Sequence, residues 1–167
     1  MDSTEQLLQS LTDAHGVPGY EAGVRAVLRD LMAPLGELTQ DKLGSLVGHQ
    51  PGQGPKVMLA GHMDEIGFVV TYISDEGFIR FLPLGGWWDQ VLLGQRVLIQ
   101  SHEGAVLGVI GAKPPHLLPA DERNKIVEKK DMYIDIGATS RAEVQAAGVR
   151  PGDPIVPDSR FTVLANP

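Results

Sequence analysis

The stretch KVMLAGHMDEIGF, residues 56–68, separates two kinds of sequence pattern. After its lysine the stretch is continuously apolar up to residue 60, which is typical of a central strand buried on both faces. Ligand sites in α/β sheets gather at the carboxyl ends of such strands, and this pattern leads directly to His62 and Asp64. We therefore expect a buried strand over residues 56–60 that delivers a polar site.

The residues before this stretch predict two helices and a short strand. The first helix is expected to begin at a capping box formed by Ser3 and Gln6, ahead of leucines at helical spacing. The second is expected over about residues 20–32, where apolar residues share one face, and to end before Pro34. A short strand is expected at residues 46–47. Helices followed by buried strands predict the start of an α/β layer.

The residues after the stretch predict a different, all-β unit. Short strand patterns at close spacing, separated by glycine turns, indicate a small β-barrel or sandwich inserted into the α/β layer. One short helix is expected within it, with Ser140 and Glu143 as its capping box. The final apolar run, residues 161–167, has the pattern of one more strand. The barrel strands are expected at residues 68–73, 78–82, 96–99, 105–110 and 132–136.

Charge and composition exclude several classes of function. The net charge of −7 and the pI near 5.1 would repel a phosphate backbone, so nucleic acid is not an expected partner. The chain has no cysteine, which excludes disulfides, thiolate zinc sites and thiol catalysis, and leaves His, Asp and Glu to bind any metal. The polar, acidic start is unlike a signal peptide, and no apolar run is long enough to span a membrane. We therefore expect a cytoplasmic protein without a membrane partner.

His62 and Asp64 form the candidate site. Residues two apart on an extended chain project to the same side, so Asp64 is placed to orient the His62 imidazole. A metal-bound imidazole usually donates its other ring nitrogen to a carboxylate, and His-x-Asp is the shortest spacing that allows this. The triplet alone recurs by chance, but the flanking Gly61 and Gly67 also allow close approach of the backbone.

Residues 61–68, Gly-His-Met-Asp-Glu-Ile-Gly-Phe, resemble the first metal-ligand motif of metallopeptidase family 42, the tetrahedral and glutamyl aminopeptidases. Four other segments stand in the family's order and spacing, so the resemblance covers nearly the whole chain. It implies an α/β fold with an inserted β-barrel. Residues 1–67 would be the N-terminal part of the catalytic domain, residues 68–163 the dimerisation barrel, and residues 164–167 the return to the catalytic half. The four segments are GYE at 19–21, DKLGSL at 41–46, KPPHL at 113–117 and DIGA at 135–138.

The resemblance also implies an activity, a metal-dependent aminopeptidase that releases N-terminal residues from peptides. In this family His62 would bind one metal, and Asp64 would be the catalytic aspartate that holds this histidine. Two divalent ions would activate a water molecule, and zinc, cobalt and manganese are all compatible with His and carboxylate ligands. Members assemble through the barrel into dimers and often dodecamers, so peptides and further copies of the chain are the expected partners.

One departure from the family pattern limits these expectations. The remaining metal ligands and the catalytic glutamate follow the barrel in the family, beyond Pro167 of this sequence. A catalytic metal normally needs about three protein ligands, so His62 alone should not retain it. We therefore expect the chain as given to be a C-terminally truncated, inactive portion. The preferred N-terminal residue, the metal and the oligomer size do not follow from the sequence.

Two other functions remain open. The chain could be a non-catalytic assembly module that keeps the barrel without the catalytic half. An endoglucanase is a weaker alternative, because some relatives carry that label. A glycosidase needs two carboxylates that flank a cleft, whereas Asp64 and Glu65 are sequence neighbours beside a histidine.

Trp87 and Trp88 are a candidate contact surface. Adjacent residues on an extended segment face opposite sides, so one indole is expected to point outward. Exposed aromatic residues are enriched in interfaces. We therefore predict that this loop contributes to a subunit contact.

The remaining histidines are not expected to bind metal. His15, His49 and His102 lie in turn-like segments, which favours solvated loop residues. His116 follows two prolines inside the predicted barrel and is interpreted as a structural or loop contact.

Overall fold

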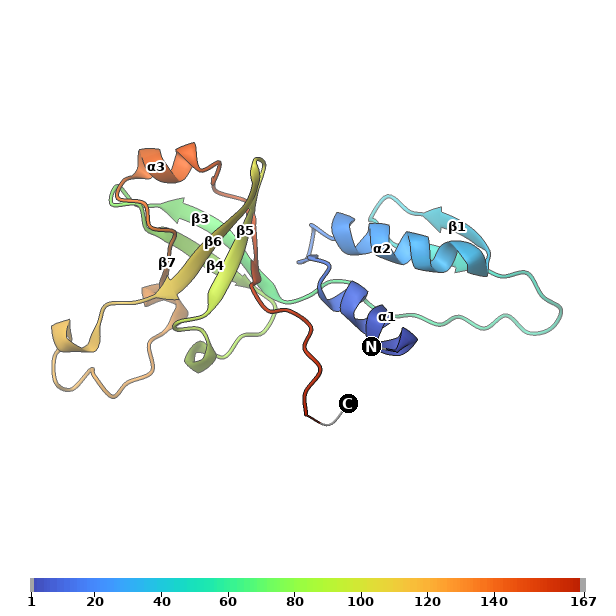
Figure 1. The fold of residues 1–167 in the computed structure, drawn as a ribbon, viewed down its shortest axis with the longest axis horizontal. Coiled ribbons are helices and arrows are strands. Elements are labelled where there is room, and N and C mark those ends of the chain that lie inside the picture. The colour runs from blue at the N-terminus through green and yellow to red at the C-terminus, as the bar shows by residue number, and fades with distance from the viewer. Residues whose placement is uncertain (1, 166–167) are drawn as a thin grey trace. The chain divides into compact units, whose positions relative to one another are not determined.

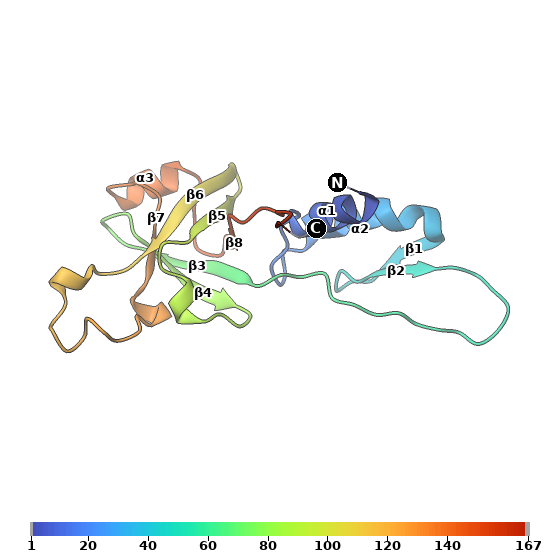
Figure 2. The ribbon, with the colours of Figure 1, turned by 60° about the horizontal axis from the view of Figure 1, so that its bottom comes forward.

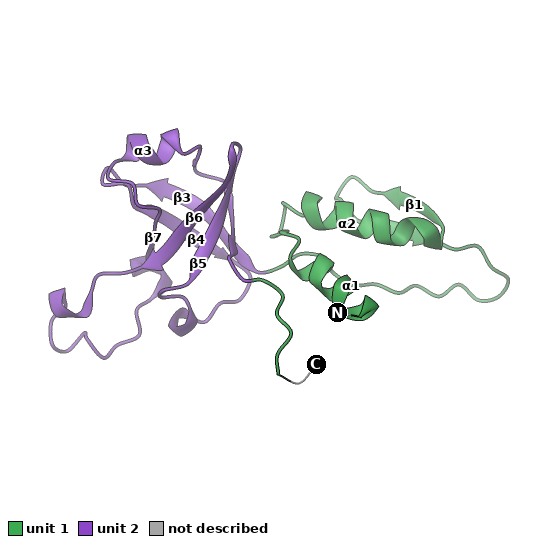
Figure 3. Cartoon of the chain, in the orientation of Figure 1, with its two compact units in different colours: residues 1–65, 160–167 green, residues 66–159 purple. Residues whose placement is uncertain are grey.

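A computed structural model of the protein describes residues 2–165. The chain divides into two compact units, which are coloured separately in Figure 3. Unit 1 contains the chain up to Glu65 and again from Arg160, and unit 2 contains residues 66–159. The chain therefore leaves unit 1 once and returns to it once, with the whole of unit 2 between these points. Each unit has its own secondary structure and is described separately.

Unit 1 combines two helices with a small antiparallel sheet (Figure 1). The expected second helix is confirmed and begins at Ala22, and the expected strand at residues 46–47 is confirmed as part of a hairpin. In this hairpin Glu37 pairs with His49, and Gln40 pairs with Leu46. The elements are α1 (Ser3–Thr12), α2 (Ala22–Met32), the 3-10 turn η1 (Ala33–Leu35), β1 (Glu37–Gln40) and β2 (Leu46–His49).

The first helix begins one residue earlier than its predicted capping box. Asp2 is the N-cap, and its carboxylate accepts hydrogen bonds from the backbone N–H groups of Thr4 and Glu5 at 2.9 and 2.8 Å. Glu5 closes the box by accepting the Asp2 N–H at 2.8 Å. The prediction of Ser3 as the cap is therefore wrong. An aspartate caps as well as a serine, and its charge also interacts favourably with the helix N-terminus.

The prediction of a buried strand over residues 56–60 is also wrong. These residues have no strand partner in the part of the chain that the structure describes, and the side chains of Val57, Met58 and Leu59 are 81, 86 and 94 % exposed. A strand that is apolar on both faces needs neighbouring strands and covering layers. The described sheet of unit 1 consists of β1 and β2, which pair only with each other. The segment expected as a strand at residues 161–167 likewise forms none over 161–165, and its last two residues lie outside the described part.

Unit 2 is built around a closed six-stranded barrel in the order β3-β4-β7-β6-β5-β8. All five predicted strands are present, and the short helix is present as α3 (Figure 1). The elements are β3 (Gly67–Ile73), β4 (Ile79–Leu84), η2 (Asp89–Val91), β5 (Arg96–Ser101), β6 (Gly104–Gly111), η3 (Pro115–Leu117), η4 (Lys129–Asp131), β7 (Tyr133–Asp135), α3 (Arg141–Ala146) and β8 (Pro154–Pro157).

The strand that closes the barrel was not predicted. β8 begins and ends with proline, a residue that lacks the N–H needed inside a sheet and therefore argues against a strand. Here the prolines stand at the two ends, and Ile155 between them pairs with Phe68 of β3 and with Ile99 of β5. The Ile155 side chain is 0 % exposed, so this strand both closes the ladder and fills the core.

The barrel core follows the period-two pattern of its strands. In β4, Ile79 and Phe81 are buried, whereas the alternate Arg80 and Leu82 are exposed. The core is completed by α3, whose Val144 is buried against the strands. The fully or almost fully buried barrel residues include Phe68, Val70, Val97, Ile99, Ile110, Ile134 and Ile155.

The cap of α3 agrees with the prediction at one of its two bonds. The Ser140 hydroxyl accepts the N–H of Glu143 at 3.3 Å, as expected. The Glu143 carboxylate, however, accepts the backbone N–H of Thr139 at 2.7 Å. His102 is exposed, as predicted, and its Nδ1 lies 3.0 Å from the carbonyl oxygen of Gly148, just after the helix.

The tryptophan pair separates as predicted, with one indole inward and one outward. Trp87 stacks on Phe68 with ring centroids 4.9 Å apart, and its Nε1 donates to the carbonyl oxygen of Gly67 at 3.1 Å. The ammonium group of Lys129 donates to the Trp87 carbonyl oxygen at 2.9 Å. Trp88 is 77 % exposed. The outward indole is therefore confirmed, and its role in a subunit contact stays a prediction.

The segment between β6 and β7 runs outward from the barrel and contains the 3-10 turns η3 and η4 but no α-helix or strand (Figure 1; Figure 2). His116 lies in η3 and its side chain is exposed. Over residues 2–165 no helix is both long enough and apolar enough to cross a membrane.

Candidate metal-ligand site

His62, Asp64 and Glu65 lie in the extended connection between β2 and β3, directly after the exposed apolar residues 57–60. All three belong to unit 1. Alternate side chains of an extended segment share a side, which makes His62 and Asp64 neighbours. The expected position at the carboxyl end of a strand is not observed, because residues 56–60 form no strand.

The contacts of the His62 imidazole decide which ring nitrogen is free. Nδ1 lies 3.0 Å from the main-chain oxygen of Asp64 and 3.2 Å from its carboxylate Oδ1. A carbonyl oxygen only accepts hydrogen bonds, so the proton is assigned to Nδ1. In the neutral ring Nε2 then keeps its lone pair, the form of histidine that binds metals. The His62 side chain is 85 % exposed, so this lone pair faces no competing protein layer.

The carboxylate of Asp64 contacts the same ring nitrogen. The expected contact between the two side chains is therefore present, and the main-chain carbonyl of Asp64 adds a second acceptor that the sequence pattern did not indicate. A carboxylate that accepts from one imidazole nitrogen raises the basicity of the other. The arrangement gives His62 a defined tautomer and leaves Nε2 free to bind a metal.

Sequence reasoning missed the partners of Glu65. Its backbone N–H donates to the carbonyl oxygen of Gly16 at 2.8 Å, and its carboxylate Oε1 accepts the Gly16 N–H at 3.1 Å. His15, predicted as a loop residue and not a ligand, lies in a loop with its side chain 28 % exposed, and its Nδ1 is 3.9 Å from the same oxygen. Gly16 and Val17, which follow His15 in this loop, are buried. Gly16 and Glu65 are 49 residues apart, so no local sequence pattern could indicate this contact.

The residues present supply only part of a metal site. Over residues 2–165, no group of three or more His, Asp or Glu side chains is arranged to hold a metal ion. Nε2 of His62 has a free lone pair that could bind a metal. The carboxylate of Asp64, however, contacts the His62 ring, and that of Glu65 contacts Gly16. Structural and catalytic metals normally have at least three protein ligands. The described residues therefore supply one ligand, His62, and not a complete metal centre.

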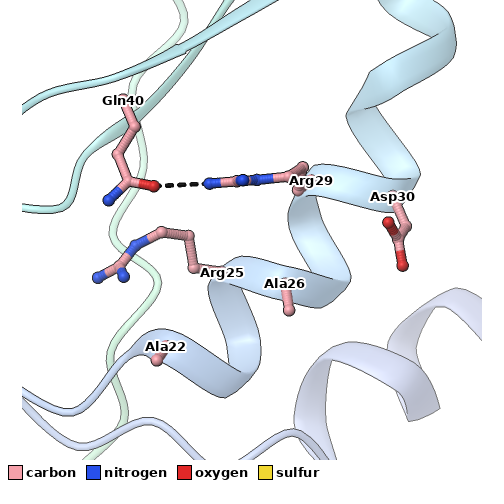
Figure 4. Close-up of a pocket in the computed structure, with 6 residues that line it drawn as sticks. All are labelled: Ala22, Arg25, Ala26, Arg29, Asp30 and Gln40. Atoms are coloured by element: carbon pink, nitrogen blue, oxygen red, sulfur yellow. Dashed lines mark hydrogen bonds between the residues drawn. The ribbon is translucent and has the colours of Figure 1, made fainter.

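A separate pocket in unit 1 lies between α2 and β1 and contains none of these site residues (Figure 4). Its two guanidinium groups are already engaged within the fold. Arg29 donates to the Gln40 side chain at 2.6 Å, and Arg25 donates from Nε to the Gly44 carbonyl oxygen at 2.7 Å. These contacts fasten α2 to the β1–β2 hairpin. The pocket is lined by Ala22, Arg25, Ala26, Arg29, Asp30 and Gln40.

The loop of this hairpin is held by Asp41. Its carboxylate accepts the backbone N–H groups of Leu43 and Ser45 at 2.9 and 2.8 Å, and the Ser45 bond above all lowers the pKa of Asp41. Gly44 has a positive φ of 98°, and a Cβ there would come within 2.5 Å of the Arg25 guanidinium. The DKLGSL segment therefore has a structural role that fits its glycine and its aspartate.

Comparison with known proteins extends these observations. A model of the family described as M42 glutamyl aminopeptidase matches residues 44–167, and a model described as AMPT matches residues 2–28. The lysyl aminopeptidase of Pyrococcus furiosus is 35% identical over 150 residues, which are 88% of this chain and 43% of that protein. The chain thus spans about half the length of the curated relatives it matches.

Solved structures agree with the family match. The TET aminopeptidase of a marine sediment Thaumarchaeota archaeon is 50% identical with a TM-score of 0.94, over 99% of this chain and 47% of that one. The TET1 peptidase of Pyrococcus horikoshii, which can assemble into a tetrahedron or a large octahedral shell, is 34% identical with a TM-score of 0.87, over 98% of this chain and 49% of that one. Sequence and fold agree over almost the entire chain, which therefore belongs to the M42 glutamyl aminopeptidase family.

Proposed function

We propose that this chain is the N-terminal part of a metal-dependent aminopeptidase and contributes His62 as a metal ligand. The observation that carries the proposal is the state of the His62 ring, whose Nδ1 donates to Asp64 and whose Nε2 is left as an exposed acceptor. Relatives that match this half of their length are named aminopeptidases. Peptides with a free N-terminus are the proposed substrates.

Asp64 is the proposed catalytic aspartate of this motif, and its role is to orient the His62 imidazole, the proposed metal ligand. By accepting from Nδ1 it keeps the ring in the metal-binding tautomer and increases the electron density at Nε2. Two divalent ions, zinc or cobalt with manganese also compatible, would polarise the peptide carbonyl and activate water once the site is complete. The other ligands and the general base would come from the part of the relatives that this chain does not cover.

The chain by itself is proposed to be inactive and to retain no metal pair. The described residues offer one suitable ligand, against the three or so that a catalytic metal requires. The side chains of residues 57–59 are apolar and exposed, and such a stretch is stable as a strand only when other strands pair with it. This exposure supports the proposal that further strands pack against this segment. We propose that these strands belong to the uncovered half of the relatives.

Self-association through unit 2 is proposed as the second role of the chain. The barrel has a complete core of its own, and a relative with the same fold assembles into closed shells. This observation also favours the alternative that the chain works as a non-catalytic assembly module. The geometry does not favour the endoglucanase alternative, although a solved structure of similar fold is described as an endoglucanase. The carboxylates of Asp64 and Glu65 contact different partners, His62 and Gly16, and do not face each other.

A chimaera tests the proposed function. This chain would replace the matching N-terminal part of the Thaumarchaeota TET aminopeptidase, with which it shares 50% identity. The chimaera is expected to bind about two metal ions per chain and to hydrolyse aminoacyl-anilides, whereas the isolated chain should do neither. Elemental analysis and an anilide assay measure both properties.

The decisive variant of the chimaera is His62→Ala, which should lose metal and more kcat/KM than the roughly 10–100-fold typical of losing only a hydrogen-bond partner of a ligand. His49→Ala is the matched control, since His49 is an exposed histidine at the end of β2. Its metal content and activity should stay unchanged. A His62→Ala chimaera that keeps both metals and full activity would show that the proposal is wrong.

A further inference from the structure

We propose that Glu65 is a positioning residue, which holds the His62–Asp64 pair in place by clamping Gly16 of the loop between α1 and α2. The proposal rests on the proposed function, because it concerns the orientation of the proposed metal ligand. Glu65 itself contacts neither a substrate nor a metal in this role. Its effect passes through the backbone.

The clamp consists of two hydrogen bonds to one glycine. The Glu65 N–H donates to the Gly16 carbonyl oxygen at 2.8 Å, and the Gly16 N–H donates to Glu65 Oε1 at 3.1 Å. Both polar backbone groups of Gly16 are thereby satisfied by a single residue. Because Gly16 is buried, an unpaired N–H there would be costly, and the Glu65 carboxylate satisfies it.

A single peptide unit connects this clamp to the imidazole. The N–H that Gly16 binds and the carbonyl oxygen that His62 Nδ1 contacts at 3.0 Å belong to the same planar peptide, between Asp64 and Glu65. Fixing the direction of its N–H therefore fixes the direction of its C=O. The C=O in turn sets the tautomer and tilt of the His62 ring.

Gly16 is itself held firmly by the buried part of unit 1. A Cβ at this position would come within 2.7 Å of Val24 Cγ1, so the backbone of the loop packs directly on α2. Val17 and Val24 are both buried. The same loop also receives the returning chain, where the Phe161 N–H donates to Asp13 Oδ1 at 2.8 Å. The clamp thus connects an exposed histidine to the buried contact between this loop and α2.

The test compares Glu65→Ala with Glu65→Gln in the 167-residue chain, with Glu37→Ala on β1 as an exposed-glutamate control. Glutamine keeps an oxygen that can accept the Gly16 N–H, and alanine does not. Hydrogen exchange of the Gly16 amide reports the clamp. Long-range ¹H–¹⁵N spectra of the His62 ring report its tautomer. The amide signals of α2 and of the β1–β2 hairpin confirm that unit 1 of each variant is folded.

Glu65→Ala is expected to speed exchange of the Gly16 amide at least about tenfold and to convert the single Nδ1–H tautomer of His62 into a mixture. Glu65→Gln should restore both signals, and Glu37→Ala should change neither. If Glu65→Ala leaves the Gly16 exchange rate unchanged, the clamp does not exist. If exchange becomes faster but the His62 spectrum does not change, the clamp exists without positioning the ring; either result overturns the proposal.

The proposed function fails in a different experiment. A His62→Ala chimaera with full metal content and activity would remove the role of His62 as a ligand, yet would leave the spectra of the Glu65 variants of the isolated chain unaffected. Conversely, normal His62 spectra in Glu65→Ala would remove the positioning role while the chimaera still lost its metal with His62→Ala. The two results therefore separate the two proposals.

Discussion

Replacing Ile155 by alanine should open the barrel where β8 joins β3 to β5. The side chain is fully buried, and its backbone pairs with Phe68 on one side and Ile99 on the other. Ile→Ala removes three buried carbons and leaves a cavity, which costs about 2–5 kcal/mol in comparable cores, whereas Ile→Val costs about 0.5–1.5 kcal/mol. Unit 2 spans residues 66–159, and a domain of that size has about 5–14 kcal/mol of stability in total.

Urea unfolding followed by tryptophan fluorescence measures this loss. The chain has two tryptophans, Trp87 and Trp88, and both lie in unit 2, so the signal reports this unit. With a urea m-value of about 1–3 kcal/mol per molar, Ile155→Ala should lower the midpoint by roughly 1–3 M and Ile155→Val by well under half of that. Leu82→Ala, an exposed leucine on β4, is the control and should cost under about 1 kcal/mol.

The reasoning fails if Ile155→Ala lowers the midpoint no more than Leu82→Ala does. That result would mean that β8 does not close the barrel and that β3 and β5 are free edges in solution. A changed m-value with an unchanged midpoint would also contradict the reasoning. That result would mean that the substitution alters the cooperativity of unfolding or the compactness of the unfolded state, and not the packing of the barrel core.

Three further predictions concern the tryptophan pair and the loop of the β1–β2 hairpin. Trp88→Ala should weaken self-association of the chain in sedimentation experiments without lowering its stability, because this indole is exposed; Trp87→Ala should instead destabilise unit 2 by about 2 kcal/mol or more, since it loses a ring stack and a hydrogen bond. An unchanged sedimentation profile for Trp88→Ala would contradict the subunit-contact role. Hydrogen bonds from Ser45 and Leu43 lower the pKa of Asp41, so their stabilisation is present above the usual value of 3.8 and is lost as pH falls through the lower folded pKa. The amide signals of Leu43 and Ser45 should therefore titrate with a midpoint below 3.8, and a midpoint above it would contradict this assignment.

Local sequence patterns were sufficient to predict strands that pack one face against the barrel core. The first four residues of β4 alternate in burial, with Ile79 and Phe81 buried and Arg80 and Leu82 exposed, because side chains of a strand point alternately inward and outward. The His62-x-Asp64 contact belongs to the same class, since it depends on residues two apart on an extended chain. Short-range geometry of this kind is contained in the spacing itself.

Apolar character alone did not determine whether residues 56–60 form a strand. A strand forms only when a second segment pairs with it. A buried-strand pattern therefore indicates that a segment needs neighbouring strands, but it does not show that these neighbours are present. β8 is the opposite case. Its prolines argue against a strand, yet it pairs with β3 on one side and β5 on the other. In both cases the outcome depends on partners far away in the chain.

The amino-acid sequence by itself determined the family, the two kinds of unit, most strands of the barrel and the His62–Asp64 pair, because each of these is written in local spacing and composition. Only the tertiary structure decided the closure of the barrel by β8 and the clamp of Glu65 on Gly16. The physical reason is the same for both. Hydrogen bonds between segments 49 or more residues apart depend on how the chain returns upon itself, and no periodicity of one segment encodes the position of the other.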